Sequence, residues 1–498
     1  MEAEAEILQP FLLHFSDLLL LSSPPPTSDE AELKRLESLS RSVMEALGPT
    51  GPGLLSIVGV PKASYLRQTL LPFARKLALL SPNALRRVLK DHSLGSDVPL
   101  KNPDRRVSSF ALQLKYVQDL SSELTSGVSR HNDEDGHIAK EQHPNVNGSH
   151  DFHDYEFKNL GRIFKELGIC MMELGLRIAQ VCDKAIGGQE LEQSILNGGT
   201  AKGRLIHYHS TIDNVILKQA RRGKRFTKGP ATHCVSLPCG LTGSEDDIPM
   251  NSGTGNGGDK QMAMDGLNLE NFENGVVSCR TSLSNLWQQW HYDYAIFTVL
   301  TTPMFLYPCC QPTSEAKDGF CILCGRECSP PNGHTYLQIF ETNRNKILLV
   351  RSPPESFIVQ VGESADILSK GKLRSTLHSV CRPVDREELS RETFVVFLQP
   401  AWDKTLSISE YPMTSAITGY ENLTLDGKVS RVNDEETELD SDVVSTHLAD
   451  RESHKIVQEI LNIVPPLFSR LKDGMTFAEF SRETTKQYYG GNGIQSKR

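Results

Sequence analysis

The segment Trp290–Leu300 constrains this chain more than any other, because it reads as a strand that carries two metal-ligand side chains. Branched and aromatic residues, which favour strands, dominate it. Side chains at positions i and i+2 of a strand share a face, so we expect His291 and Asp293 to project together. His378 lies far downstream on another predicted strand. Two imidazoles and one carboxylate that leave open positions form the ligand set that selects non-haem Fe(II).

The remaining candidate site residues are polar and lie on further predicted strands. Strands are expected over residues 357–361, 373–380 and 391–398. The second of these bears His378, and Arg391 and Thr393 share a face of the third by the same period of two. A guanidinium and a hydroxyl on one face suit the far carboxylate of a dicarboxylic acid, because arginine offers a planar fork of donors.

A chain of 498 residues has room for one large domain with insertions or for two to three domains. An apolar helical stripe is expected over 154–185, and short strands broken by turns from about Leu205 to Pro400 indicate a barrel or sandwich. We predict a helical and mixed N-terminal region at 1–126, a polar His-rich loop at 127–153, a helix plus β core at 154–403 with insertions at 240–275 and 307–334, and an acidic connector with C-terminal helices at 404–498.

Composition narrows the partners and the compartment. A net charge of −9 gives no global argument for binding nucleic acid, and we expect none. The longest apolar stretch, Ile7–Leu21, is broken by Pro10, His14 and Asp17, and its acidic leader is unlike a signal peptide. Eleven irregularly spaced cysteines suit a reducing compartment. We therefore expect a cytoplasmic monomer without a membrane partner. The basic run Lys218–Lys228 is typical of a solvated face, but it leaves open a nuclear location or a docking site for an acidic substrate.

These segments resemble the plant-type 2-oxoglutarate- and Fe(II)-dependent oxygenases, the family that includes isopenicillin N synthase. His291–Leu300 is similar to the family's metal strand, and Val361–His378 is similar to the segment of its second histidine. The resemblance runs from about Arg204 to Trp402 and more loosely over 38–110. It implies a mainly β core, a double-stranded β-helix (jelly roll), with flanking helices in the N-terminal region and a helical C-terminal extension.

The resemblance also implies a site. His291, Asp293 and His378 would ligate Fe(II), and Arg391 with Thr393 would bind the distal carboxylate of 2-oxoglutarate. The usual Arg-x-Ser of the family is Arg-x-Thr here, which keeps the hydroxyl.

A second departure affects the cosubstrate. The family's Asn-Tyr-Tyr-Pro run, whose second tyrosine helps to hold 2-oxoglutarate, resembles His207-Tyr208-His209-Ser210. His209, and beside it His207, are therefore candidate cosubstrate-binding residues.

The implied activity is oxidation of a C–H bond in a small organic substrate by O₂ and 2-oxoglutarate, with release of succinate and CO₂. Two alternatives stay open: an inactive barrel that serves as a binding or regulatory protein, and an iron oxidase of the same fold that does not use 2-oxoglutarate.

The insertion at 307–334 carries ligand types that a structural zinc accepts. They are Cys309, Cys310, Cys321, Cys324, Cys328 and His334. A strong zinc signal needs two well-spaced pairs, and the insertion offers one pair with scattered extras, so a reduced surface insertion is the favoured interpretation.

Overall fold

The computed structural model describes residues 6–23, 29–100, 102, 104–116, 156–222, 285–307, 326–409, 411–412, 458–460 and 462–489. The predicted loop at 127–153, the insertion at 240–275 and most of the acidic connector lie outside these residues, as do residues 308–325 of the second insertion. Residues 1–220 and 278–498 form one compact unit, which includes the described parts of the predicted N-terminal region, core and C-terminal helices.

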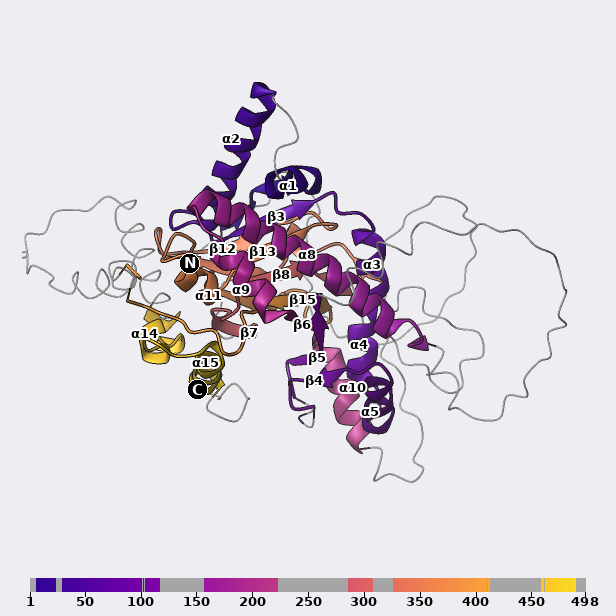
Figure 1. Cartoon of the computed structure of the whole chain (residues 1–498). Helices are drawn as coiled ribbons and strands as arrows, with labels where there is room; N and C mark the ends of the chain where they lie inside the picture. Colours follow the sequence, from indigo (N-terminus) through magenta and orange to yellow (C-terminus); the bar gives the residue numbers. More distant parts are fainter. Residues whose placement is uncertain are drawn as a thin grey trace, which may run out of the picture. The chain divides into compact units, whose positions relative to one another are not determined.

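Figure 1 shows the described strands and helices, coloured in the order of the sequence. The strands are β1 Glu6–Leu8, β2 Leu12–His14, β3 Leu54–Val58, β4 Gly95–Ser96, β5 Val107–Lys115, β6 Thr200–Tyr208, β7 Leu286–His291, β8 Phe297–Thr301, β9 Met304–Leu306, β10 Glu327–Cys328, β11 Leu337–Glu341, β12 Lys346–Val350, β13 Phe357–Val361, β14 His378–Cys381 and β15 Ser390–Leu398. The helices are α1 Phe15–Ser22, α2 Glu30–Leu47, α3 Ala63–Leu70, α4 Pro72–Leu79, α5 Pro82–Asp91, α8 Leu160–Ile186, α9 Glu190–Gly198, α10 Thr211–Arg222, α11 Glu363–Leu368, α14 Leu467–Arg470 and α15 Phe477–Tyr489, with a 3₁₀ turn, η1, at Pro331–Gly333.

Two sheets form the core. The small sheet has the order β1-β12-β11-β14-β7, and the large one β2-β3-β13-β8-β15-β6-β5-β4, with β9 on β15 and β10 on β9. Trp287 and Leu337 of the small sheet pack in one buried cluster with Leu300 and Val395 of the large sheet. Apolar side chains from both sheets thus fill the space between them, and the predicted jelly-roll core with flanking helices is confirmed.

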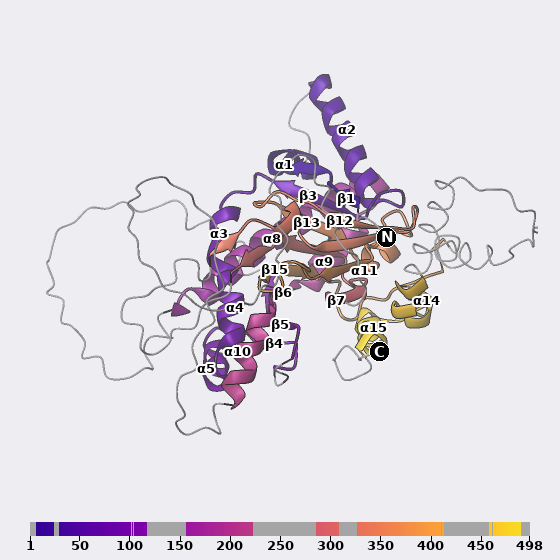
Figure 2. The same ribbon diagram turned by 180° about the vertical axis from the view of Figure 1, so that it is seen from behind.

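Helix α8 covers the outer face of the large sheet, as Figures 1 and 2 show from opposite sides. Its apolar stripe packs on outward-facing residues of β8 and β15, and the rings of Phe164 and Phe394 meet edge to face at 4.7 Å. A Cβ on Gly175 would lie 2.5 Å from a Leu398 methyl, so the glycine permits close approach of helix and sheet. The helical stripe predicted over 154–185 is therefore the outer layer of the core.

The prediction of one strand over Trp290–Leu300 is wrong. Strand β7 ends at His291 and β8 begins at Phe297. The physical reason is that β7 belongs to the small sheet and β8 to the large one, so residues 292–296 cross between the sheets. The strand predicted over 373–380 is likewise shorter at its start, since β14 begins at His378.

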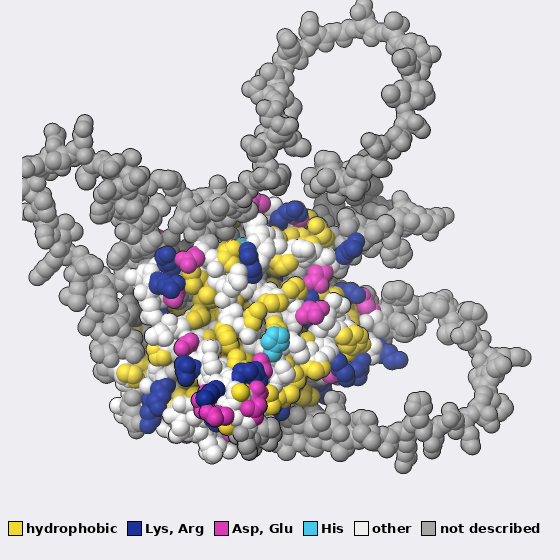
Figure 3. All heavy atoms as spheres, turned by 90° about the horizontal axis from the view of Figure 1, so that it is seen from above, with side chains coloured by type: hydrophobic (Ala, Val, Ile, Leu, Met, Phe, Trp, Pro, Cys, Tyr) yellow, Lys and Arg dark blue, Asp and Glu magenta, His cyan; other side chains and the backbone are white. Residues whose placement is uncertain are grey.

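The face of the molecule shown in Figure 3 carries side chains of both charges. On that face, seen from above, Lys and Arg side chains alternate with Asp and Glu among apolar patches, and neither sign forms a continuous field. Among the described helices, none has the length and apolar character needed to cross a bilayer.

Candidate metal centre

Three ligand-type side chains meet where the chain crosses between the sheets. His378 of β14 lies directly opposite His291 of β7, so neighbouring strands of the small sheet place the two imidazoles together. Their ring centroids are 4.3 Å apart. His291 Nε2 lies 3.7 Å from Asp293 Oδ1, and His378 Nε2 lies 3.8 Å from Asp293 Oδ2. The structure thus brings all three predicted ligands together, although Asp293 comes from the crossing segment and not from a strand.

Hydrogen bonds orient the two imidazoles. His291 Nδ1 donates to the Gln289 carbonyl at 2.8 Å, and His378 Nδ1 donates to the Thr376 carbonyl at 3.0 Å. A carbonyl oxygen only accepts, so each Nδ1 carries a proton, and Nε2 is the nitrogen of each ring that can ligate a metal. Burial, together with the neighbouring His378, lowers the pKa of His291 to about 4. The ring is therefore neutral at pH 7, as metal binding requires.

Asp293, the third ligand-type residue, is held both through its side chain and through the backbone of its segment. Asp293 Oδ2 accepts a hydrogen bond of 2.7 Å from Thr298 Oγ1, at the start of β8. The Asp293 carbonyl accepts from the Glu363 amide at 2.8 Å, and the Ala295 carbonyl accepts from the Ser364 amide at 3.1 Å. The first amides of α11 therefore fix the backbone of the crossing segment, because the first amides of a helix have no partner within it.

A polar bridge joins this cluster to the interior of the large sheet. The Gln288 amide nitrogen donates to His291 Nε2 at 2.9 Å, and its Oε1 accepts from the Tyr208 hydroxyl at 2.9 Å. A metal ion held by His291 Nε2 would replace the first of these bonds, and the Gln288 amide would then be available to another acceptor. Sequence reasoning missed both Gln288 and Tyr208.

Arg391 and Thr393 lie on the inner face of β15, and both side chains are buried. Arg391 Nε donates to the Thr335 carbonyl at 3.1 Å, whereas its Nη1 has no hydrogen-bond partner among the described residues. Thr393 Oγ1 donates a weaker bond to the Thr301 carbonyl at 3.3 Å. A buried guanidinium nitrogen without an acceptor fits a carboxylate, so the residues present suit the predicted cosubstrate.

The structure does not bring His207 or His209 to Arg391. In the β6–β15 register Tyr208 lies opposite Arg391, and His207 lies opposite Glu392. Because neighbouring residues alternate between faces, Tyr208 shares the inner face, and the Arg391 guanidinium lies over its ring at 5.0 Å. If the family's Asn-Tyr-Tyr-Pro run is matched to this chain one residue earlier, its second tyrosine falls on Tyr208.

His207 instead lies in a buried chain of alternating charge. Its Nδ1 bonds to the Glu392 carboxylate at 2.9 Å, its Nε2 lies 3.5 Å from Asp213 Oδ2, and Asp213 pairs with Arg75 at 2.9 Å. Burial lowers the pKa of His207, but the carboxylates of Glu392 and Asp213 outweigh it and raise the pKa to about 9.

His207, His209 and Asp213 also have the spacing of a metal site. The imidazolium form of His207 and the Arg75 guanidinium together already balance the two carboxylates, so a dication would add uncompensated charge to a buried place. We interpret this cluster as structural. His209 Nε2 bonds to Ser108 Oγ at 2.8 Å on the same side of the sheet.

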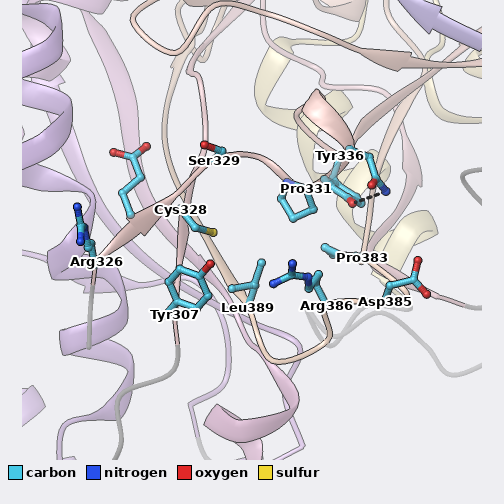
Figure 4. A pocket seen from close by; sticks show the side chains of 12 residues that line it. Tyr307, Arg326, Cys328, Ser329, Pro331, Tyr336, Pro383, Asp385, Arg386 and Leu389 are labelled. Atoms are coloured by element: carbon cyan, nitrogen blue, oxygen red, sulfur yellow. Dashed lines mark hydrogen bonds between the residues drawn. The ribbon is translucent and has the colours of Figure 1, made fainter. Parts of the chain in front are cut away.

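Figure 4 shows a cavity of about 530 Å³. Tyr336, Arg386 and Leu389 line it together with Tyr307 and Arg326, and none of the three ligands does. Of the residues considered as zinc ligands, Cys328 is half-buried and His334 is buried, and the four other cysteines lie outside the described residues.

Comparison with known proteins agrees with this geometry. Residues 315–400 match the sequence model of the 2OG-Fe(II) oxygenase superfamily. Over these residues the chain therefore carries the sequence pattern of the 2OG-Fe(II) oxygenase superfamily, as the resemblance predicted, and the cofactors of that superfamily are 2-oxoglutarate and Fe(II). The matched segment contains His378, Arg391 and Thr393. His291 and Asp293 precede it, so their assignment as candidate ligands rests on the geometry described above.

Solved structures give weaker likenesses. A full-length Neurospora crassa protein in complex with alpha-KG and 5-formyluracil is 12% identical, over 82% of this chain and 90% of that one, with a TM-score of 0.41. The dioxygenase for auxin oxidation in rice is 13% identical, over 81% and 89%, with a TM-score of 0.40. A putative 2OG-Fe(II) oxygenase family protein from Caulobacter crescentus is 12% identical, over 81% and 90%, with a TM-score of 0.38. These proteins come from a fungus, a plant and a bacterium, so the plant-type part of the prediction is not confirmed. A search of curated proteins found no match.

Proposed function

We propose that this protein is an oxygenase that uses Fe(II), 2-oxoglutarate and O₂ to oxidise a C–H bond of a small organic molecule, with release of succinate and CO₂. The observation that carries the proposal is the convergence of His291, Asp293 and His378 on an interior that also holds the unpaired Nη1 of Arg391. The small-molecule substrate rests on the family resemblance alone.

Each residue has a distinct task in this proposal. His291, Asp293 and His378 hold iron, and the backbone carbonyls behind the imidazoles keep their Nε2 lone pairs in place. Bound iron and 2-oxoglutarate supply, with O₂, the oxidising power that removes hydrogen from a C–H bond. Arg391 binds the far carboxylate of the cosubstrate in a water-poor interior, where a charge-assisted bond is strong.

Tyr208 and Gln288 complete the cosubstrate side. The Tyr208 ring supports the Arg391 guanidinium, and its hydroxyl holds Gln288. If His291 held the metal, the Gln288 amide would be freed from His291 and would offer the site a hydrogen-bond donor. Thr393 places its hydroxyl on the same face as Arg391.

The proposal is tested by anaerobic titration of the purified protein with Fe(II) and then 2-oxoglutarate, followed by the visible charge-transfer band of a 2-oxo acid chelated to iron. His378→Ala should abolish the band, and Arg391→Ala should raise the 2-oxoglutarate needed by about 10- to 100-fold. His14→Ala and Arg351→Ala, which alter exposed residues of the same types, serve as matched controls.

The other outcomes identify the alternatives. Iron binding without the band would point to an oxidase that does not use 2-oxoglutarate, and absence of iron binding would point to an inactive barrel. If the band forms, Tyr208→Phe should weaken 2-oxoglutarate binding by about fivefold, the value of one hydrogen bond, whereas His209→Gln should leave it unchanged. The reverse result would restore His209 as the cosubstrate residue.

A further inference from the structure

The outer side of the metal-binding segment is covered by the C-terminal part of the chain. His291 and Asp293 face the site, and the residues that alternate with them, Tyr292 and Tyr294, contact residues far downstream in the chain. The ring of Tyr294 lies 5.9 Å from that of Phe477 at the start of α15. Tyr292 packs in one cluster with Tyr488 at the end of the same helix. Helix α15 thus spans the back of the segment from one end to the other.

Tyr488 of α15 contacts both a ligand-type side chain and the backbone beside it. Its hydroxyl oxygen accepts a hydrogen bond of 3.1 Å from the Tyr292 amide, the peptide that lies between His291 and Asp293. Its ring also meets the His291 imidazole edge to face, with centroids 6.5 Å apart. One side chain therefore touches a ligand ring and holds the backbone that joins two ligands.

A buried ion pair anchors this arrangement. Arg470 of α14 is 1% exposed and donates through both terminal nitrogens to the Glu363 carboxylate, at 2.7 Å for Nη1. The same guanidinium donates to Thr484 Oγ1 at 3.1 Å and lies over the Tyr488 ring at 5.4 Å. A bidentate pair of this kind fixes orientation as well as distance.

Glu363 connects the anchor to the ligands from the other side. Its backbone amide donates to the Asp293 carbonyl, while its side chain binds Arg470. The crossing segment is therefore held through Tyr488 at residue 292 and through Glu363 at residue 293. Both supports depend on α14 and α15, which lie outside the matched segment 315–400.

We infer that the C-terminal segment 462–489 is a working part of the metal centre, in which Tyr488 and the Arg470–Glu363 pair are positioning residues that keep His291 and Asp293 in ligating geometry. The inference rests on the proposed metal site and adds residues that touch the ligands without binding the metal. Hydrogen bonds to the groups behind metal ligands change metal affinity by roughly 10- to 100-fold, and we expect the lower end of that range for a backbone bond.

The test is metal affinity in the full-length protein, measured anaerobically with Co(II) alone, whose visible absorption reports coordination geometry. Tyr488→Phe keeps the ring and removes the hydroxyl that accepts from the Tyr292 amide. It should weaken Co(II) binding by about tenfold and alter the Co(II) spectrum. Tyr411→Phe is the matched control, because its hydroxyl is bonded to Asp366 and not to the ligand segment.

A second variant keeps the inference testable if one substitution affects folding. Replacing both charges, Glu363→Gln with Arg470→Met, removes the pair without leaving an unpaired buried charge. It should weaken Co(II) binding in protein whose circular dichroism remains native. The inference is overturned if Tyr488→Phe and the double variant bind Co(II) like Tyr411→Phe, with an unchanged spectrum. In that case the proposed function still stands, whereas a wild-type protein that binds no Co(II) through His378 would overturn both.

Discussion

At the scale of single residues, the two faces of strand β6 have different chemistry. Tyr208 turns inward to Arg391 and Gln288, and His207 turns outward to Glu392 and Asp213. The inward face offers groups that can still bind a ligand. The outward face has its charges already balanced, so its histidine contributes to stability and not to binding.

The outward face predicts a pH-dependent stability. Because Glu392 and Asp213 raise the pKa of His207 from about 6.5 to about 9, its contribution is fully present below about 6.5 and is lost as pH rises through about 9. The loss should be on the order of 3 kcal/mol in the free energy of unfolding. Denaturant titrations between pH 6 and 10 measure it.

The matched comparison is His207→Gln, which should be less stable at pH 6 and should lack this part of the pH dependence. The structural interpretation fails if wild type and variant lose stability in parallel over that range. Tight binding of Zn²⁺ by the wild type, lost in His207→Gln, would also contradict it.

At the scale of elements, the β13–α11 junction sets the position of the metal ligands. The Gly362 amide donates to the Ile296 carbonyl at 2.9 Å, and the next two amides bind the carbonyls of Asp293 and Ala295. Strand β13 is paired with β8, so the junction comes against the crossing segment as soon as the strand ends. This close approach leaves no room for a side chain at Gly362.

Gly362→Ala should therefore disturb both folding and metal binding. Its Cβ would lie 2.1 Å from the Ala295 carbonyl oxygen, which is backbone and gives way only if the crossing segment moves. We expect a loss of about 1–3 kcal/mol in the free energy of unfolding, together with weaker Co(II) binding. Gly188→Ala, where nothing lies within 4 Å of the added atom, is the control. Equal stability and equal metal affinity of the two variants would contradict this account of the junction.

At the scale of the whole molecule, the site depends on segments from both ends of the described chain. Strands β1 and β2, near the N-terminus, join the small and the large sheet respectively. Helices α14 and α15, near the C-terminus, cover the back of the crossing segment. The ligands at residues 291, 293 and 378 lie between these supports, so metal binding should be coupled to global stability.

This coupling predicts that ligands stabilise the folded protein. Metal at 100 times its dissociation constant should raise the free energy of unfolding by about 2.7 kcal/mol, because the unfolded chain holds no such site. Anaerobic thermal unfolding with and without Co(II) measures the effect, and further addition of 2-oxoglutarate should add to it. His378→Ala should show no increase. An identical midpoint of wild type with and without metal would argue against a preformed site.

Much of this protein could be predicted from sequence, because the features concerned are local. The apolar stripe of α8 and the alternation along β15 follow from the helical and extended periods, and both were found. The identities of His291, Asp293 and His378 suggested a metal, and the Arg391–Thr393 spacing suggested a carboxylate. The C-terminal helices were expected too, although their contact with the site was not.

Tertiary structure decided the rest, because it depends on which distant segments pair. The end of β7 at His291 follows from the assignment of β7 and β8 to different sheets, which no local pattern records. The inward direction of Tyr208 follows from its register against Arg391, and a shift of one residue would have reversed it. The support from Tyr488 joins residues 196 positions apart in the chain. Sequence by itself thus determined the residue types and elements of the site, whereas sheet pairing and long-range packing determined their geometry.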